Sequence, residues 1–118
     1  MDVFEIENAF YRECETNRIS KFLAHAKLYE MSLGLPGEFV EIGVFKGASF
    51  SRFRKLGALM HPDHTRRFVG FDVFGKFPTP DIEADREEFE RLLIDVGDTS
   101  IDLEEFRSIL QAQNLEKN

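Results

Sequence analysis

Apolar residues recur with the period of an α-helix in five stretches of the chain, and two short runs between them have the character of strands. The helical stretches span residues 3–14, about 18–33, 48–60, about 82–96 and about 103–110. The runs Glu38–Ile42 and Arg67–Asp72 are short and rich in β-branched and aromatic residues, which predicts strands. The order strand, glycine-bounded loop, helix, strand predicts a parallel, right-handed βαβ unit.

Residues that favour helix ends stand at the borders of these stretches. They are, in chain order, Thr16 or Asn17 as the cap of the second helix, Gly34 after it, the loop His61–His64 after the third helix, Gly97 after the fourth, and Thr99 with Asp102 as a capping box for the fifth. We therefore expect short, separate helices joined by turns.

The two predicted strands are both apolar enough to be buried. Parallel strands of this kind normally lie inside a sheet with helices on both faces, and a sheet of two strands leaves both edges unpaired. Either another copy of the chain completes the sheet, or the later strands are absent from this polypeptide, which we favour. The expected fold class is α/β, and the sequence resembles the opening half of an α/β domain whose later strands are absent. Residues 1–118 would form one partial domain, with residues 1–35 as a helical lead-in.

The composition limits the partners and the compartment. Lys and Arg number 15 against 22 Asp and Glu, a net charge of −7, which disfavours nucleic acid and anionic membrane as partners. No stretch approaches the roughly 20 apolar residues of a membrane span, and the acidic start Met1–Glu5 does not resemble a signal peptide. Because Cys14 is the one cysteine, we expect a cytoplasmic protein. Its 13 Phe residues predict a Phe-rich core.

Two glycines and an acid carry the chemistry of the predicted βαβ unit. Gly43 follows the first strand, where a glycine lets the backbone turn tightly and approach a ligand. Gly47 opens the next helix and exposes backbone N–H groups there. Asp72 ends the second strand, where open α/β sheets bind the ribose hydroxyls of adenosine-bearing cofactors. Each feature alone is weak, because glycines bracket many turns and a strand-end Asp often caps one. Together, at one end of the sheet, they favour a cofactor site.

The spacing and charge of this loop distinguish between cofactors. The pattern Gly-x-x-x-Gly leaves the dinucleotide fingerprint incomplete. Glu41 beside the loop would repel a pyrophosphate and attract an ammonium or sulfonium cation. S-adenosylmethionine carries both cations and no phosphate, which favours it as the cofactor. Lys46 partly offsets this charge, either by pairing with the cofactor's carboxylate or, as we prefer, by lying solvated on the outside of the loop.

The segment Leu35–Ser49 resembles motif I of the class I S-adenosylmethionine-dependent methyltransferases, most closely that of the macrocin O-methyltransferase-like group, which acts on sugars of macrolides and related natural products. Phe71–Pro78 resembles that group's second signature, an Asp followed by an aromatic residue, a Gly and a Pro. The resemblance covers about residues 17–80 and implies a Rossmann-like three-layer sandwich of the methyltransferase type, truncated after its second or third strand region. It implies site roles for Glu41, Gly43 and Gly47 at the methionine end of the cofactor, Ser49 at its carboxylate, Asp72 at the ribose, and Val73 and Phe74 beside the adenine.

Three functions follow as hypotheses. The first is the cofactor-binding half of an S-adenosylmethionine-dependent O-methyltransferase that acts on a sugar or other small-molecule hydroxyl. In the family, the catalytic base and the divalent-metal ligands lie on later strands, so the resemblance assigns neither here. The second is a non-catalytic Rossmann-like fragment or binding module. The third and weakest is a nucleotide-dependent oxidoreductase, against which Glu41 and the absent third glycine argue. Unpaired sheet edges and abundant Phe also suggest a homo-oligomer.

Other polar groups are better explained by packing and solvation than by chemistry. The segment His61–His64 holds two His and an Asp, but its Pro breaks any helical face, so we expect an exposed loop and not a metal site. The acids between residues 81 and 90 begin a helix, where the helix dipole favours negative charge, and they are expected to be solvated. His25 is expected to be a partly exposed helix residue, and Cys14 to serve packing.

Overall fold

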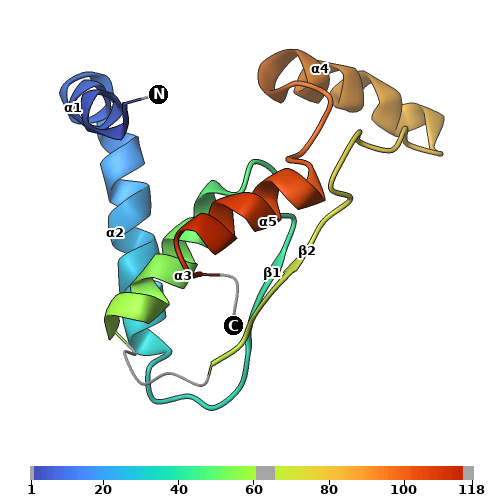
Figure 1. Cartoon of the computed structure of the whole chain (residues 1–118). Helices are drawn as coiled ribbons and strands as arrows, with labels where there is room; N and C mark the ends of the chain where they lie inside the picture. Colours follow the sequence, from blue (N-terminus) through green and yellow to red (C-terminus); the bar gives the residue numbers. More distant parts are fainter. Residues whose placement is uncertain (1, 61–65, 116–118) are drawn as a thin grey trace. The chain divides into compact units, whose positions relative to one another are not determined.

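The computed structural model of the chain describes residues 2–60 and 66–115, and the chain forms two compact units, Met1–Leu35 and Pro36–Asn118 (Figure 1). The helical lead-in expected over residues 1–35 spans the first unit. The loop expected at His61–His64 lies outside the described residues. Among the described residues, no helix is both long and apolar enough to cross a membrane.

The first unit consists of two helices at the positions that the apolar period predicts. They are α1 (Val3–Glu13) and α2 (Thr16–Met31). Asp2 caps α1, because its carboxylate accepts a hydrogen bond from the backbone N–H of Phe4 at 2.9 Å. This contact satisfies one of the N–H groups that the first turn of a helix leaves without a partner.

The ends of α2 differ from the sequence prediction. Glu15 holds the N-cap position in an extended conformation, so Thr16 and Asn17 are already helical and capping by either is wrong. Asn17 instead donates from its side-chain amide to the Glu15 carboxylate at 3.2 Å. At the other end Ser32 is the C-cap, so Gly34 lies in the turn beyond the helix and does not end it.

The second unit contains the predicted parallel βαβ arrangement. β1 (Phe39–Ile42) and β2 (Phe68–Phe71) pair in parallel, and α3 (Ala48–Met60) connects them. Each strand begins one residue later than predicted, and β2 ends immediately before Asp72. The backbone N–H of Gly43 bonds to the Phe71 carbonyl at 2.7 Å, so the pairing continues one step past the strands at their carboxyl ends.

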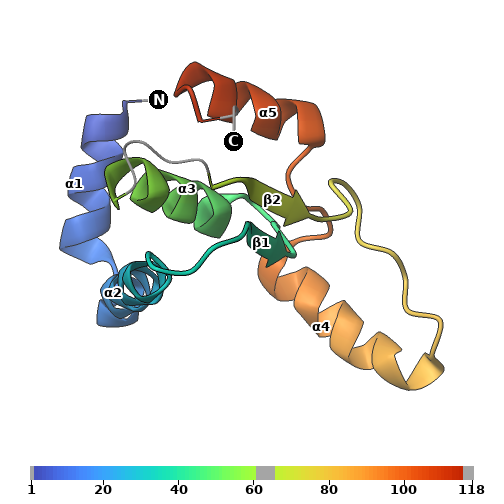
Figure 2. The same cartoon turned by 90° about the horizontal axis from the view of Figure 1, so that it is seen from below.

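Three helical elements follow β2 within residues 72–115. They are the 3-10 turn η1 (Glu83–Asp85), α4 (Arg86–Val96) and α5 (Leu103–Ala112). The helix predicted over about 82–96 therefore begins with a 3-10 turn. Gly97 ends α4 with a φ of +84°, as predicted. Figures 1 and 2 both show α4 extending away from the two strands.

The predicted capping box before α5 is only partly correct. Asp102 is the N-cap, and its carboxylate accepts from the backbone N–H groups of Glu104 and Glu105 at 3.0 and 3.1 Å. Thr99 takes no part in the cap, since it forms an isolated antiparallel bridge with Lys76. The residues between Gly97 and Asp102 are thus used for tertiary pairing and not for helix capping.

The core of the second unit is built from phenylalanine rings, as the composition predicts. Phe50 of α3 lies 5.6 Å from Phe106 of α5 and 6.5 Å from Phe68 of β2, both edge-on. All three rings are buried, and each such ring pair adds about 0.5–1.5 kcal/mol beyond its buried area. Arg54 is only 2% exposed, and its guanidinium lies 5.0 Å from the Phe68 ring centre. Aromatic contacts therefore join α3 to β2 and α5 to α3.

The opposite face of the sheet is apolar and exposed. Strand register places Phe39 and Phe68 on the face that contacts α3, and Ile42 and Phe71 on the other. Ile42 is 86% exposed and Phe71 is 57% exposed. The described residues thus form a mixed helix–strand unit with a two-stranded parallel sheet, and the complete three-layer sandwich stays a prediction.

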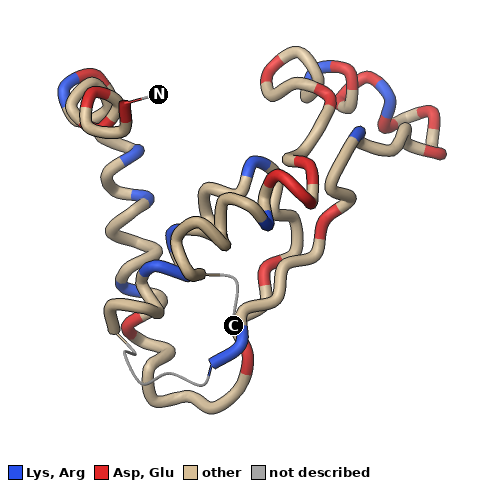
Figure 3. Tube along the Cα trace, in the orientation of Figure 1, with Lys and Arg blue, Asp and Glu red and all other residues tan. Residues whose placement is uncertain are grey.

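The acidic stretch between residues 81 and 90 forms an exposed, ion-paired surface. Figure 3 shows acidic and basic residues interspersed along η1 and α4. Arg86 pairs with Glu83 at 3.3 Å and Arg91 with Glu87 at 2.8 Å, and all four side chains are more than half exposed. Exposed pairs of this kind contribute little to stability, about 0.3–0.5 kcal/mol on a helix. The stretch is exposed to solvent, as its place at the start of a helix predicts.

Candidate functional site

The candidate site lies at the carboxyl ends of β1 and β2. Glu41 is the penultimate residue of β1 and is half-buried, with its oxygen Oε2 shielded from solvent. The loop that begins at Gly43 follows β1, and Asp72 follows β2. Because the strands are parallel and in register, the loop, Glu41 and Asp72 all lie at the same end of the sheet.

Asp72 joins the loops that follow the two strands. Its Oδ1 accepts from the backbone N–H groups of Val44 and Phe45 at 3.1 and 3.4 Å. Its Oδ2 accepts from the backbone N–H of Phe74 at 2.9 Å and from the hydroxyl of Ser100. An ionised carboxylate has about four acceptor positions, so these four donors engage all of them.

The hydrogen bonds also set the charge of this carboxyl group. Burial by itself would raise the pKa of Asp72, but the hydrogen bonds from Ser100 and from the backbone of Phe74, Phe45 and Val44 together outweigh it. The pKa of Asp72 is therefore held below its ordinary value. At neutral pH the group is a carboxylate that organises the surrounding N–H donors.

Both glycines of the loop have positive φ, but only one of them has a close neighbour. Gly43 has a φ of +92°, and nothing lies within 4 Å of the position that a Cβ would take. The conformation alone therefore requires glycine there. Gly47 has a φ of +88°, and a Cβ would lie 2.7 Å from Cε2 of the Phe106 ring. Glycine at position 47 is thus explained by the close approach of α5, and its contact with a cofactor stays a prediction.

Two phenylalanines beside Asp72 have left-handed backbone conformations. Phe45 has a φ of 55° and Phe74 a φ of 52°. Such a conformation costs a residue other than glycine about 1–3 kcal/mol and is found mainly where surrounding contacts enforce it, often at functional sites. The backbone N–H of each donates to the Asp72 carboxylate, so Asp72 stabilises both strained turns.

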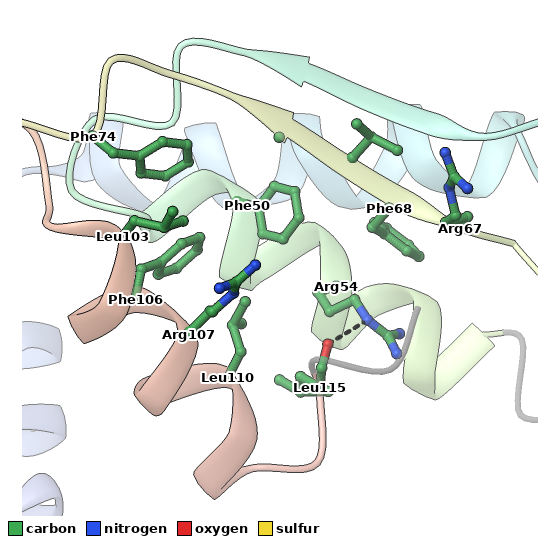
Figure 4. Close-up of a pocket in the computed structure, with 12 residues that line it drawn as sticks. Phe50, Arg54, Arg67, Phe68, Phe74, Leu103, Phe106, Arg107, Leu110 and Leu115 are labelled. Atoms are coloured by element: carbon green, nitrogen blue, oxygen red, sulfur yellow. Dashed lines mark hydrogen bonds between the residues drawn. The ribbon is translucent and has the colours of Figure 1, made fainter.

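The remaining residues implied by the family resemblance lie around this loop in different settings. Ser49 is half-buried in the first turn of α3. Val73 is 53% exposed. The ring of Phe74 lies beside Leu103 and Phe106 in a mostly apolar hollow of about 420 Å³ between α5, α3 and β2 (Figure 4). Val73 does not line that hollow, so a common adenine site for Val73 and Phe74 remains a prediction.

Sequence reasoning missed the segment 98–101, which pairs with both loops. Ser100 donates its backbone N–H to the Gly75 carbonyl at 2.9 Å, and Ile101 donates to the Phe45 carbonyl at 2.7 Å. Lys46 is exposed, as expected, and its Nζ donates to the Thr99 carbonyl at 2.7 Å. No local pattern signals these contacts, because the segment lies between a helix-ending Gly and a helix-capping Asp and has the composition of an ordinary turn.

The described residues offer no cluster of metal ligands. Residues 2–60 and 66–115 contain no group of three or more His, Cys, Asp or Glu side chains placed to hold an ion. Cys14 is a half-exposed free thiol, and His25 is half-exposed on α2. The pair His61 and His64, which the sequence analysis assigned to a loop, lies outside the described residues.

The described unit, with a glycine loop and an acid at the carboxyl end of a parallel βαβ arrangement, has a methyltransferase-like fold. Among solved structures, the chain is similar to the crystal structure of CalS11, a calicheamicin methyltransferase, with 30% sequence identity and a TM-score of 0.59. The similarity covers 73% of this chain and 34% of CalS11, so the chain spans about a third of that protein's length. No family model matches the chain, and a search of curated proteins finds no match.

Proposed function

We propose that this chain is the cofactor-binding half of an S-adenosylmethionine-dependent O-methyltransferase with a Rossmann-like fold. The observation that carries the proposal is the hydrogen bonding between the glycine loop and Asp72. It occurs at one end of a βαβ unit, in a chain that is similar to a methyltransferase. When bound, S-adenosylmethionine supplies a methyl group on a sulfonium for transfer to a nucleophile. The task of this chain is to bind and orient that donor.

The residues at the carboxyl ends of the strands fit the chemistry of this cofactor. Glu41 places a half-buried carboxylate beside the glycine loop, where it would favour the ammonium and sulfonium charges. The first turn of α3, which contains Ser49, offers N–H groups and a hydroxyl to the cofactor's carboxylate. Open space at Gly43 leaves room for close approach of a ligand to the backbone. Gly47 ends the loop directly before α3 and is proposed to lie at the methionine end of the cofactor.

The adenosine end of the cofactor is assigned to the residues after β2. Asp72 is proposed to accept hydrogen bonds from the ribose, and Val73 and Phe74 to flank the adenine. Asp72 already accepts four hydrogen bonds, so a ribose hydroxyl must replace one of them. Glu41 also favours a cation over the pyrophosphate of a dinucleotide, which together with the absent third glycine argues against an oxidoreductase.

The acceptor is proposed to be a sugar or another small-molecule hydroxyl. This rests on the resemblance of two sequence segments to the macrocin O-methyltransferase-like group and on similarity to a calicheamicin methyltransferase. We assign no catalytic base and no metal ligand to this chain. A divalent metal would enter only through a further part of the protein. We propose a cytoplasmic location, homo-oligomer formation through the exposed sheet, and no nucleic-acid or membrane partner.

Ligand binding tests the proposal directly. S-adenosylmethionine and S-adenosylhomocysteine should raise the melting temperature and give saturable heats in calorimetry, because a ligand that binds only the folded state stabilises it by mass action, about 2.7 kcal/mol at 100 times the dissociation constant. NAD at the same concentration should produce no shift. Failure of both adenosyl compounds to bind at millimolar concentration would overturn the proposal. Binding without methyl transfer to any sugar acceptor would favour the second hypothesis, a non-catalytic binding module.

A further inference from the structure

Ser100 lies at the centre of the contacts around Asp72. It is only 5% exposed, and its hydroxyl donates to Oδ2 of Asp72. The hydroxyl oxygen of Ser100 accepts from the backbone N–H of Gly75 at 3.2 Å, and it lies 3.3 Å from the Gly75 carbonyl, a second acceptor for the hydroxyl proton. The hydroxyl of Ser100 therefore has two alternative acceptors within reach.

The four donors to Asp72 differ in how freely they can leave. Val44, Phe45 and Phe74 donate from the backbone, so withdrawing any of them requires rearrangement of a strained loop. Ser100 donates from a side-chain hydroxyl, and rotation of that side chain about its Cα–Cβ bond moves the oxygen away from Oδ2 without moving the backbone. Among these four contacts, the hydroxyl of Ser100 is the one that an incoming ligand can displace at the lowest cost.

We infer that the hydroxyl of Ser100 occupies the position on Asp72 that a ribose hydroxyl of the ligand takes, and that Ser100 thereby weakens the binding of ribose-bearing ligands. This inference rests on the proposed function. Ligand entry exchanges one hydroxyl-to-carboxylate hydrogen bond for another, so Asp72 adds little to affinity while Ser100 is present. Ser100 acts through Asp72 and is a residue that sets selectivity, without touching the reacting atoms.

Removal of the hydroxyl should leave the surrounding backbone contacts in place. The segment 98–101 remains attached through the backbone bonds from Ser100 to Gly75 and from Ile101 to Phe45, at 2.9 and 2.7 Å. In the Ser100→Ala variant, Oδ2 of Asp72 keeps its bond from Phe74 and has one acceptor position available. A ribose hydroxyl would then gain a bond to a carboxylate with no competing donor.

The test compares ligands with and without ribose hydroxyls on matched variants of the full chain. Calorimetry would measure the affinities of S-adenosylhomocysteine, adenosine and 2′,3′-dideoxyadenosine for the unchanged chain, for Ser100→Ala and for Ser108→Ala. Ser108 is an exposed serine of α5 whose hydroxyl donates to the Glu104 carbonyl at 2.9 Å, which makes it a control of the same chemistry. We expect Ser100→Ala to bind S-adenosylhomocysteine and adenosine about three- to tenfold tighter, with no change for dideoxyadenosine and no effect of Ser108→Ala.

Equal or weaker binding of adenosine by Ser100→Ala would overturn the inference, as would an equal gain for dideoxyadenosine, because a general loosening of the loops does not depend on the ribose hydroxyls. Should Ser100→Ala fail to fold, Ser100→Cys is the second variant, because its side chain is of similar size and is a much weaker donor. It should give an intermediate gain in affinity, and no gain overturns the inference.

If the unchanged chain binds adenosine and Ser100→Ala binds it no tighter, this inference alone fails. If no variant binds S-adenosylhomocysteine or adenosine, the proposed function fails with it.

Discussion

The carboxylate of Asp72 accepts a hydrogen bond from the backbone N–H of Val44 at 3.1 Å, although 28 residues separate the two in the chain. Val44 begins the turn after β1 and is buried, and Asp72 directly follows β2. The bond therefore connects the loops that follow the two parallel strands. Its presence makes Asp72 a structural residue of the loop as well as the proposed ribose ligand, and these two roles can be separated by experiment.

Asp72→Asn should destabilise the fold. An asparagine side chain has an N–H₂ group in place of one of the two carboxylate oxygens. That group cannot accept a hydrogen bond, so one pair of donors would lose its acceptor. The pair is Phe74 with Ser100 or Val44 with Phe45, depending on which way the amide is turned. We expect a loss of about 1–3 kcal/mol in the free energy of unfolding, measured by urea titration. Asp95→Asn on the exposed surface of α4 is the control and should change this free energy by less than about 0.5 kcal/mol. Equal effects of the two changes would contradict the assignment.

The stabilisation from Asp72 should depend on pH in a defined direction. Because the pKa of Asp72 is lower in the folded chain than in the unfolded chain, its contribution is fully present above the unfolded value of about 3.9. It is lost as the pH falls through the lower folded value, since the unfolded state binds the proton more readily. The free energy of unfolding should therefore drop below about pH 4, and the drop should be smaller in Asp72→Asn. If the free energy of unfolding fell equally with pH in the unchanged chain and in Asp72→Asn, this prediction would be contradicted.

Gly47→Ala should be costly because of α5. The added Cβ would lie 2.7 Å from the buried Phe106 ring, and the φ of +88° disfavours any side chain. Strain of this kind costs about 1–3 kcal/mol, visible as a lower urea midpoint. Gly75→Ala is the matched control, because nothing lies within 4 Å of its Cβ position and its φ is not in the left-handed region. A neutral Gly47→Ala would show that α5 does not pack closely against the loop.

Glu41→Gln tests the charge argument for the cofactor. If Glu41 favours a sulfonium, the change should weaken binding of S-adenosylmethionine about three- to tenfold and leave adenosine, which has no cationic group, unaffected. Calorimetry on both ligands gives the ratio. Glu88→Gln on the exposed surface of α4 serves as the control for a loss of net charge. An equal change in affinity for both ligands would assign Glu41 to general stability and not to recognition of the cation.

The βαβ unit is encoded locally, and the sequence alone was sufficient to find it. The apolar runs at β1 and β2 and the helical period between them depend on neighbours within one element, which is why Ala48–Met60 was located correctly. Helix ends were less predictable, because several residues compete for each cap. Glu15 is the N-cap where Thr16 or Asn17 was expected, and Asp102 is the N-cap where Thr99 was expected.

The engagement of Asp72 was decided by tertiary structure. The sequence placed Asp72 and the glycine loop at one end of the sheet, because parallel pairing follows from the βαβ order. It contained no signal that Ser100, 28 residues beyond Asp72, would donate to the same carboxylate. It also held no local sign that Phe106 would require glycine at position 47. Contacts of that range depend on how loops and helices meet after folding, so a pattern read within one element cannot contain them.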